Sequence, residues 1–311
     1  MPRITWPDLP DAVRSRVEAT LGGTVVAHRS HPGGFSPGTA DRVQTASGDD
    51  AFVKAVHPDL NPDTPDIHRA ELRVMRSFPP GLPTPALLDG FEVDGWVVLV
   101  LEHVDAAHPA EPWTADTFAP VLEATLRLSD ALTPTPMTGL EPASGQAARL
   151  WAGWGNLAPD PPDDLDPWLR GRLPELVARA ERNLATLDGD TLCHFDLRAD
   201  NILLRPDGEV VFIDWPWACR GARWLDAGLL VADFAATQED HGATDGFVRR
   251  VAEHTGVDPE TLVDALVAAT GFLVEASRRP SPPGLPTLRD FQRSLAGGLT
   301  AWLRASDLSA G

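Results

Sequence analysis

The chain has 311 residues, 43% of them hydrophobic, and a net charge of −19. This length predicts two lobes with sizeable cores, and the excess of acid argues against a nucleic-acid partner, because phosphate binding needs Lys and Arg. No apolar run approaches the roughly 20 residues of a membrane span, and the first residues contain no apolar signal segment. Cys193 and Cys219 alone cannot form a disulfide framework, so a cytoplasmic protein that does not contact a membrane is expected.

The first hundred residues have the pattern of a small sheet with accompanying helices. The expected order is helix 8–21, strands 24–30, 39–46 and 51–56, helix 67–78, and strands 86–93 and 96–104. The dipeptide Asp94-Gly95 is typical of the tight turn that joins two antiparallel strands. A small antiparallel sheet with one main helix is therefore predicted.

The composition changes near residues 104–112, which we interpret as a hinge. Beyond it the chain is predicted to be mainly helical, over 114–132, 145–155, 166–188, 223–237, 244–256, 259–277 and 286–305. One β-rich island, residues 191–215, interrupts these helices. We therefore expect an α+β protein with a first lobe over 1–103 and a larger, mostly helical lobe over 104–311.

The β-rich island contains an ordered set of polar residues. His194, Asp196 and Asn201 form the pattern H-x-D-x-x-x-x-N, and an apolar strand then ends in I-D-W at Asp214. This resembles the catalytic loop and metal-binding strand of protein-kinase-like enzymes, and most closely the aminoglycoside phosphotransferase family and its choline-kinase-like relatives. Protein kinases have D-F-G at this point, whereas here Asp214 is followed by Trp215, and no A-P-E segment follows. Both differences favour a small-molecule substrate. The resemblance covers about residues 22–235 and implies a bilobal protein-kinase-like fold.

The resemblance implies a role for each residue of this set. Asp196 would hold the attacking hydroxyl in line and take its proton. Asn201 and Asp214 would supply the hard oxygen ligands that Mg²⁺ prefers, and an antiparallel hairpin between them would bring them together. His194 is expected to orient the loop. Arg198 would either steady the γ-phosphate or form a structural salt bridge.

The first lobe contains the matching features of a nucleotide site. The only lysine of the chain, Lys54, lies in the third predicted strand, and Glu71 lies in the following helix. A kinase-type site needs a lysine there to hold the α- and β-phosphates and a glutamate to hold the lysine. A plain solvated helix residue is the alternative for Glu71.

Two further segments complete the predicted nucleotide site. Gly33, Gly34 and Ser36 lie between the first two strands, where backbone N–H groups and a hydroxyl can approach phosphate; an ordinary hairpin turn is the alternative. The resemblance also implies that the carbonyl of Glu102 and the N–H of Val104 contact adenine.

The acceptor site is less specified. Trp215 and Trp217 are candidates to stack on a sugar or ring, with core packing as the alternative. Asp226 is a candidate acceptor contact, although a structural tie to the catalytic loop is the commoner role at such a position. The acidic stretches 160–166 and 238–245 either contact a cationic amino sugar or form a solvated surface.

We therefore expect Lys54, Asp196, Asn201 and Asp214 to share one pocket around ATP or GTP and Mg²⁺. The predicted reaction moves the γ-phosphate to a hydroxyl of a small molecule, with an aminoglycoside-like or other amino-sugar antibiotic as the leading acceptor. A choline, homoserine or sugar kinase is the enzymatic alternative, and a non-catalytic nucleotide-binding regulator is the alternative of another class. Either a monomer or a homodimer is compatible with the sequence.

Overall fold

The computed structural model describes residues 4–31, 37–238, 241–282 and 287–306. The chain forms two compact units. The first comprises Met1–His108 and Asp200–Ala218, and the second comprises Pro109–Ala199 and Cys219–Gly311. The segment 200–218 therefore belongs to the first unit, whereas the lobe boundary near residue 104 remains a prediction.

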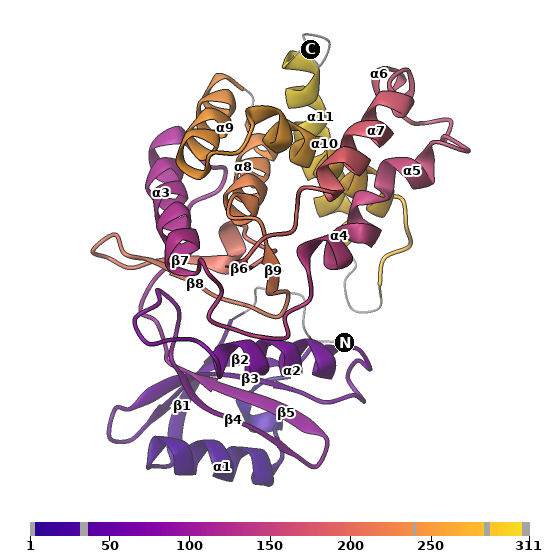
Figure 1. The fold of residues 1–311 in the computed structure, drawn as a ribbon. Helices are drawn as coiled ribbons and strands as arrows, with labels where there is room; N and C mark the ends of the chain where they lie inside the picture. The colour runs from indigo at the N-terminus through magenta and orange to yellow at the C-terminus, as the bar shows by residue number, and fades with distance from the viewer. Residues whose placement is uncertain (1–3, 32–36, 239–240, 283–286, 307–311) are drawn as a thin grey trace. The chain divides into compact units, whose positions relative to one another are not determined.

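The first unit is built on a five-stranded antiparallel sheet in the order β1-β2-β3-β5-β4 (Figure 1). Its strands are β1 (Val25–Ser30), β2 (Thr39–Thr45), β3 (Asp50–Val56), β4 (Leu87–Val93) and β5 (Trp96–Leu101). All five strands expected from the sequence are present. Asp94 and Gly95 have positive φ angles of 49° and 84°, as a tight hairpin turn requires.

Two helices cover opposite faces of this sheet (Figure 1). The helix α1 (Asp11–Leu21), which follows the short η1 (Trp6–Asp8), contributes Val13 to the same core cluster as Val53 of β3, and neither residue is exposed. Side chains alternate between the two faces along a strand. Lys54 therefore points to the other face, where α2 (Thr64–Met75) lies.

A short hairpin from the β-rich island also belongs to the first unit. It follows η2 (Ala199–Asn201) and pairs β7 (Ile202–Leu204) with β8 (Val210–Phe212) in antiparallel register. The turn between them includes Gly208, whose φ of 90° is in the left-handed region that favours glycine. The backbones of Ala107 and Leu204 exchange hydrogen bonds of 3.1 and 2.7 Å, which fixes the hairpin to the segment after β5.

The second unit is mostly helical. Its helices are α3 (Ala115–Ala131), α4 (Ala143–Trp151), α5 (Gly153–Leu157), α6 (Pro167–Arg170), α7 (Leu173–Leu184), α8 (Leu225–Ala236), α9 (Gly242–Thr255), α10 (Pro259–Ala276) and α11 (Leu288–Ala305). The central helix is α10, which contacts α5, α7, α8 and α11. In the part of the chain that the structure describes, no helix combines the length and apolar character needed to cross a membrane.

Two of the expected helices are each divided into two. The predicted helix 166–188 breaks between α6 and α7, because Pro174 starts a new helix at its first turn, where a missing N–H costs nothing. The predicted helix 145–155 breaks before Gly153, which packs so closely on the backbone of Gly271 that a Cβ would lie 2.3 Å from its carbonyl oxygen.

The second unit also contains a short antiparallel strand pair, β6 (Thr191–Cys193) with β9 (Cys219–Gly221). The strand β9 was not expected from the sequence. Its three residues form a strand only because β6 lies beside them.

Candidate active site

In the first unit, the only lysine of the chain is held by two carboxylates. The Nζ of Lys54 donates to both carboxylate oxygens of Glu71, at 2.7 and 2.9 Å, and to Oδ1 of Asp214 at 2.9 Å. Burial alone would lower the pKa of Lys54, but the charges of Asp214 and Glu71 outweigh it and raise that pKa above its usual value. Lys54 therefore stays a fixed ammonium at physiological pH.

Glu71 is the buried partner of this pair, with 2% of its surface exposed. Burial raises the pKa of its carboxyl, and the ammonium of Lys54 opposes that shift. A carboxylate in such a place needs its partner, because an unpaired buried charge is strongly destabilising. The geometry fits the lysine-holding role expected for Glu71 rather than a solvated helix position.

The hairpin brings the two expected metal ligands to neighbouring strand ends. Asn201 precedes β7, and its carbonyl oxygen accepts a 3.0 Å hydrogen bond from the N–H of Ile213, the residue before Asp214. Asn201 is buried, whereas the side chain of Asp214 is about half exposed. Asp214 has a φ of 67°, a conformation that Asp tolerates better than most residues. Amide and carboxylate oxygens so placed fit the ligand preference of Mg²⁺.

The remaining predicted nucleotide contacts are only partly described. Glu102 and Val104 follow β5 directly, and the N–H of Glu102 donates to the carbonyl oxygen of Ala86 at 2.8 Å. The predicted contacts Gly33, Gly34 and Ser36 lie outside the described residues.

Just after that loop, the chain passes very close to β3. A Cβ at Gly38 would lie 2.3 Å from the carbonyl oxygen of Ala55, which is less than any real contact of this kind. Glycine is therefore required at residue 38, beside the strand position that follows Lys54.

The catalytic loop of the resemblance lies in the second unit, directly after β6. The backbone N–H groups of His194 and Phe195 donate to the two carboxylate oxygens of Asp226, at 2.7 and 2.9 Å. The N–H of Asp196 lies 3.3 Å from Nδ1 of His194, which is fully buried. These contacts leave the Asp196 side chain 37% exposed, and they fit an orienting role for His194.

The loop has an unusual backbone conformation. Phe195 has a φ of 69°, which is an outlier for a bulky residue and costs roughly 1–3 kcal/mol. The two hydrogen bonds to Asp226 and the stacking of Phe195 on Trp151, with ring centroids 6.3 Å apart, hold this conformation. Strain of this kind is concentrated at functional sites, so it supports the assignment of this loop.

Of the two roles considered for Asp226, the geometry matches the structural tie to the catalytic loop and not the acceptor contact. It is 4% exposed, and both of its oxygens accept backbone hydrogen bonds from the loop. Burial raises its pKa to about 6, against the opposing effect of the two hydrogen bonds. The interpretation of Asp226 as an acceptor contact does not fit this geometry, because its oxygens face the loop backbone.

A second carboxylate of α8 holds the other end of the loop, and the sequence analysis did not identify it. Oδ2 of Asp233 accepts hydrogen bonds from Nε1 of Trp113 at 2.9 Å and from the N–H of Ala199 at 3.2 Å. Burial raises the pKa of Asp233 to about 6. Asp226 and Asp233 are seven residues apart, and therefore two turns apart on one helix face. The sequence does contain a signal for this role. Two acidic residues in an otherwise apolar helix indicate carboxylates that hold another segment, because buried carboxylates need partners.

Arg198 lies beside Asp196, with its Nε 3.5 Å from Oδ1. Its guanidinium also lies over the ring of Phe291, 5.6 Å from the centroid. The contact with Asp196 matches the salt-bridge alternative. A role at the γ-phosphate stays a prediction.

The two tryptophans proposed to stack on an acceptor differ in exposure. Trp215 is fully buried, packs edge-on against Phe78 at 4.9 Å and donates from Nε1 to the carbonyl oxygen of Phe212. Stacking of Trp215 on a ligand is therefore wrong for this structure, and core packing is the correct alternative. Trp217 is 46% exposed.

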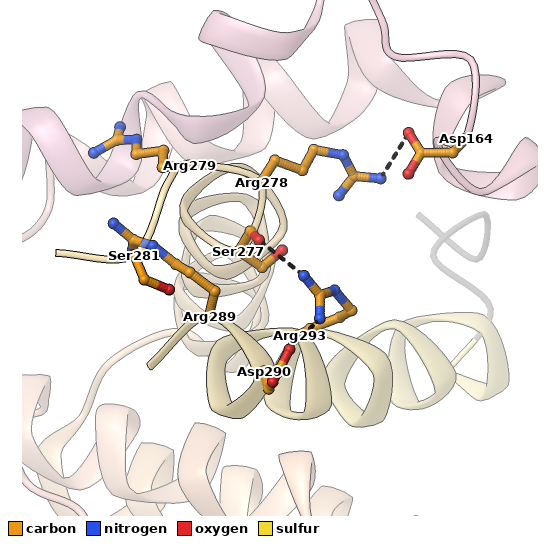
Figure 2. A pocket seen from close by; sticks show the side chains of 8 residues that line it. All are labelled: Asp164, Ser277, Arg278, Arg279, Ser281, Arg289, Asp290 and Arg293. Carbon is orange, nitrogen blue, oxygen red and sulfur yellow. Dashed lines mark hydrogen bonds and ion pairs between the residues drawn. The ribbon is translucent and has the colours of Figure 1, made fainter. Parts of the chain in front are cut away.

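Two acidic residues of the stretch 160–166 form ion pairs with arginines of the same chain. Asp164 lies 3.5 Å from Arg278, and Asp166 pairs with Arg304. Asp164, Arg278 and Arg293 line a pocket of about 650 Å³. Arg293 pairs there with Asp290 at 2.6 Å (Figure 2). Apart from Asp164 of the acidic stretch, no predicted site residue that the structure describes lines this pocket.

The structure thus assembles two groups of predicted residues. Lys54, Glu71, Asn201 and Asp214 belong to the first unit. His194, Asp196 and Arg198 belong to the second. That both groups act in one pocket remains a prediction.

Comparison with known protein families gives a match over most of the chain. The model of a family described as "Phosphotransferase enzyme family" matches residues 28–260. No curated protein sequence matches the chain.

Solved structures with the same fold include kinases of small molecules. Choline kinase LicA from Streptococcus pneumoniae has a TM-score of 0.59 at 15% identity, over 93% of this chain and 98% of that one. Aminoglycoside phosphotransferase APH(4)-Ia has a TM-score of 0.61 at 16% identity, over 96% and 99%. Aminoglycoside-3'-phosphotransferase of type VIII has a TM-score of 0.52 at 24% identity, over 84% and 98%. The expected α+β, protein-kinase-like fold is confirmed.

Proposed function

The chain belongs to the phosphotransferase enzyme family, and from that premise we propose that it moves the γ-phosphate of ATP or GTP onto a hydroxyl group of a small molecule. The observation that carries the proposal is the fixed conformation of the loop around Asp196, whose carboxylate is partly exposed while its backbone neighbours are held by Asp226. A positioned carboxylate is the group that this reaction requires of the protein.

In the proposed reaction the oxygen of the acceptor hydroxyl attacks the γ-phosphorus. The bond between that phosphorus and the β–γ bridging oxygen breaks, and the electron pair leaves with the nucleoside diphosphate. The proton of the hydroxyl passes to the carboxylate of Asp196. The products are a phosphate monoester and the diphosphate, so atoms and charge balance.

The first unit would bind the triphosphate. The ammonium of Lys54, fixed by Glu71, is suited to neutralise the α- and β-phosphates. Asn201 and Asp214 would hold Mg²⁺, which supplies positive charge to the phosphate oxygens when bound. Solved structures of the same fold are described as ternary complexes of APH(4)-Ia mutants with ADP or AMP-PNP and hygromycin B, which supports a nucleotide and a small-molecule acceptor.

The proposal leaves the acceptor class open between the two expected from the sequence, amino-sugar antibiotics and metabolic alcohols such as choline or homoserine. A non-catalytic regulator is disfavoured, because such proteins usually lack the base or a metal ligand. Asp196, Asn201, Asp214 and Lys54 are all present.

The test is an Asp196→Ala variant in a coupled assay for ADP release, with a panel of amino sugars, amino alcohols and sugars as acceptors. Loss of the proton acceptor should lower kcat by roughly 10²- to 10⁴-fold. Binding of a non-hydrolysable ATP analogue, followed by calorimetry, should change by only a few-fold. A variant with nearly intact kcat would rule out Asp196 as the base.

A further inference from the structure

A second cavity of the second unit borders Asp196. Its volume is about 190 Å³, and Phe195, Asp196 and Arg198 of the catalytic loop line it together with side chains of α8, α10 and α11. An engineered cavity of about 150 Å³ in another protein, lined by aliphatic and aromatic side chains, binds benzene. The cavity beside Asp196 is therefore large enough for one ring or a short branched chain.

The walls of this cavity are apolar and incompletely covered. Leu150, Phe272, Leu273, Leu288 and Leu295 line it and are each partly exposed, and Phe291 is 38% exposed. A contiguous set of half-exposed apolar side chains around a concave site is typical of ligand binding. Burying this surface in a complex would be favourable, because it removes apolar area from water.

The charges around the cavity do not suit a polycation. Of the described residues that line it, the charged ones are Asp196, Arg198 and Asp233. Asp233 accepts hydrogen bonds from Trp113 and Ala199, and Arg198 adds a positive charge. In the acidic stretch 160–166, which might have contacted an amino sugar, Asp164 and Asp166 pair instead with Arg278 and Arg304.

Resting on the phosphoryl transfer proposed above, we propose that the acceptor carries an uncharged apolar portion, about the size of a substituted benzene ring, which binds in this cavity and presents the neighbouring hydroxyl to Asp196. The acceptor class is thus an alcohol with an aromatic or branched aliphatic body. A polycationic amino sugar fits this cavity poorly, because its several ammonium groups would be desolvated among leucine and phenylalanine side chains, with Asp233 already hydrogen-bonded within the protein and Arg198 beside Asp196.

The test separates binding from turnover. The probe is 2-phenylethanol, whose binding to the full-length protein without nucleotide is measured by ligand-observed NMR. Ala269 lines the cavity on α10, and an Ala269→Phe variant would fill the space. Ala301 lies exposed on α11 and does not line the cavity, so Ala301→Phe is the matched control. Leu295→Gln, at a partly exposed lining position, makes the wall polar without adding bulk.

We expect Ala269→Phe to raise the Kd for 2-phenylethanol by about tenfold or more, which corresponds to about 1.4 kcal/mol. Leu295→Gln should raise it by a smaller factor, and Ala301→Phe should leave it unchanged. Circular dichroism and binding of the ATP analogue check that each variant is folded. If 2-phenylethanol fails to bind, or binds equally to the wild type and both cavity variants, the proposal is refuted.

Turnover gives a second, independent reading. In the ADP-release assay, alcohols with an aromatic body should have a higher kcat/KM than hygromycin B or streptomycin. Faster turnover of the amino sugars would overturn the apolar acceptor and leave the phosphoryl transfer intact. Absence of ADP release with every acceptor, despite nucleotide binding, would instead count against the proposed function, and with it the acceptor role of the cavity.

Discussion

Replacing Asp226 by Asn tests whether this buried carboxylate positions the catalytic loop. In the wild type, one oxygen of Asp226 accepts from the N–H of His194 and the other from the N–H of Phe195. An amide of the same shape retains only one acceptor, and its NH₂ group would face a donor. One buried N–H would then be unsatisfied, at a cost of roughly 1–3 kcal/mol.

The charge of Asp226 acts in the opposite direction. Burial raises its pKa from the ordinary 3.8 to about 6, so the folded protein holds this proton more tightly than the unfolded chain. The group therefore favours folding below its unfolded pKa, and that contribution is lost as the pH rises through about 6. The loss is about 3 kcal/mol at 1.36 kcal/mol per pKa unit. An amide has no such dependence.

The two effects nearly cancel at pH 7, whereas at pH 4 only the lost hydrogen bond remains. We therefore expect Asp226→Asn to be clearly less stable than the wild type at pH 4 and close to it at pH 7, with a change in ΔΔG of roughly 2–3 kcal/mol between these conditions. Urea unfolding at a series of pH values measures this difference. A ΔΔG independent of pH would refute the raised pKa.

The same variant should lower kcat while nucleotide affinity is retained, because the displaced backbone carries Asp196. A steady-state comparison of kcat with analogue binding separates the two quantities. Full activity in a variant that has lost a loop hydrogen bond would show that Asp226 does not position the base.

Three further outcomes are expected. Lys54→Arg should lower kcat/KM for nucleotide by at least about tenfold although the charge is kept, because a flat guanidinium cannot reproduce the compact contacts of the ammonium. Wild-type kinetics in this variant would show that catalysis does not need the lysine. Gly38→Ala should destabilise the first unit by roughly 1–3 kcal/mol in thermal unfolding, because the added Cβ clashes with β3. The control Gly246→Ala, at an open helical position, should stabilise the protein by up to about 1 kcal/mol. Equal effects of the two variants would contradict the close approach of Gly38 to β3. Trp113→Phe should cost about 1 kcal/mol more in urea unfolding in the wild type than in an Asp233→Ala background, because only the wild type has the carboxylate that accepts from Nε1 of Trp113. Equal losses in the two backgrounds would argue against this hydrogen bond.

The nucleotide half of the site was largely predictable from local pattern. Alternation along the strand at 51–56 places Lys54 opposite the residues that pack on α1, and helix periodicity then places Glu71 on α2 beside it. The hairpin turn between two short apolar strands likewise brings Asn201 next to Asp214. These features depend on periods of 2 and 3.6 and on turn chemistry, all of which are carried by neighbouring residues.

The catalytic half depended on contacts that local pattern does not encode. The motif located Asp196, but only the packing of α8 showed that Asp226 and Asp233 hold the two ends of its loop. Similarly, Trp215 is followed by Pro216 and the exposed Trp217, and its burial against Phe78 was visible only in the folded unit.

The sequence by itself determined the order of the strands along the chain, through short-range periodicity. Its ordered motif gave the residues proposed for phosphoryl transfer, and the family resemblance of that motif implied the fold class. Only the tertiary structure decided the character of the space beside Asp196. The side chains that form that cavity lie between residues 150 and 299, on separate helices. Each of these helices buries one face and leaves another partly exposed. Which faces meet is set by long-range packing, and no local pattern records it.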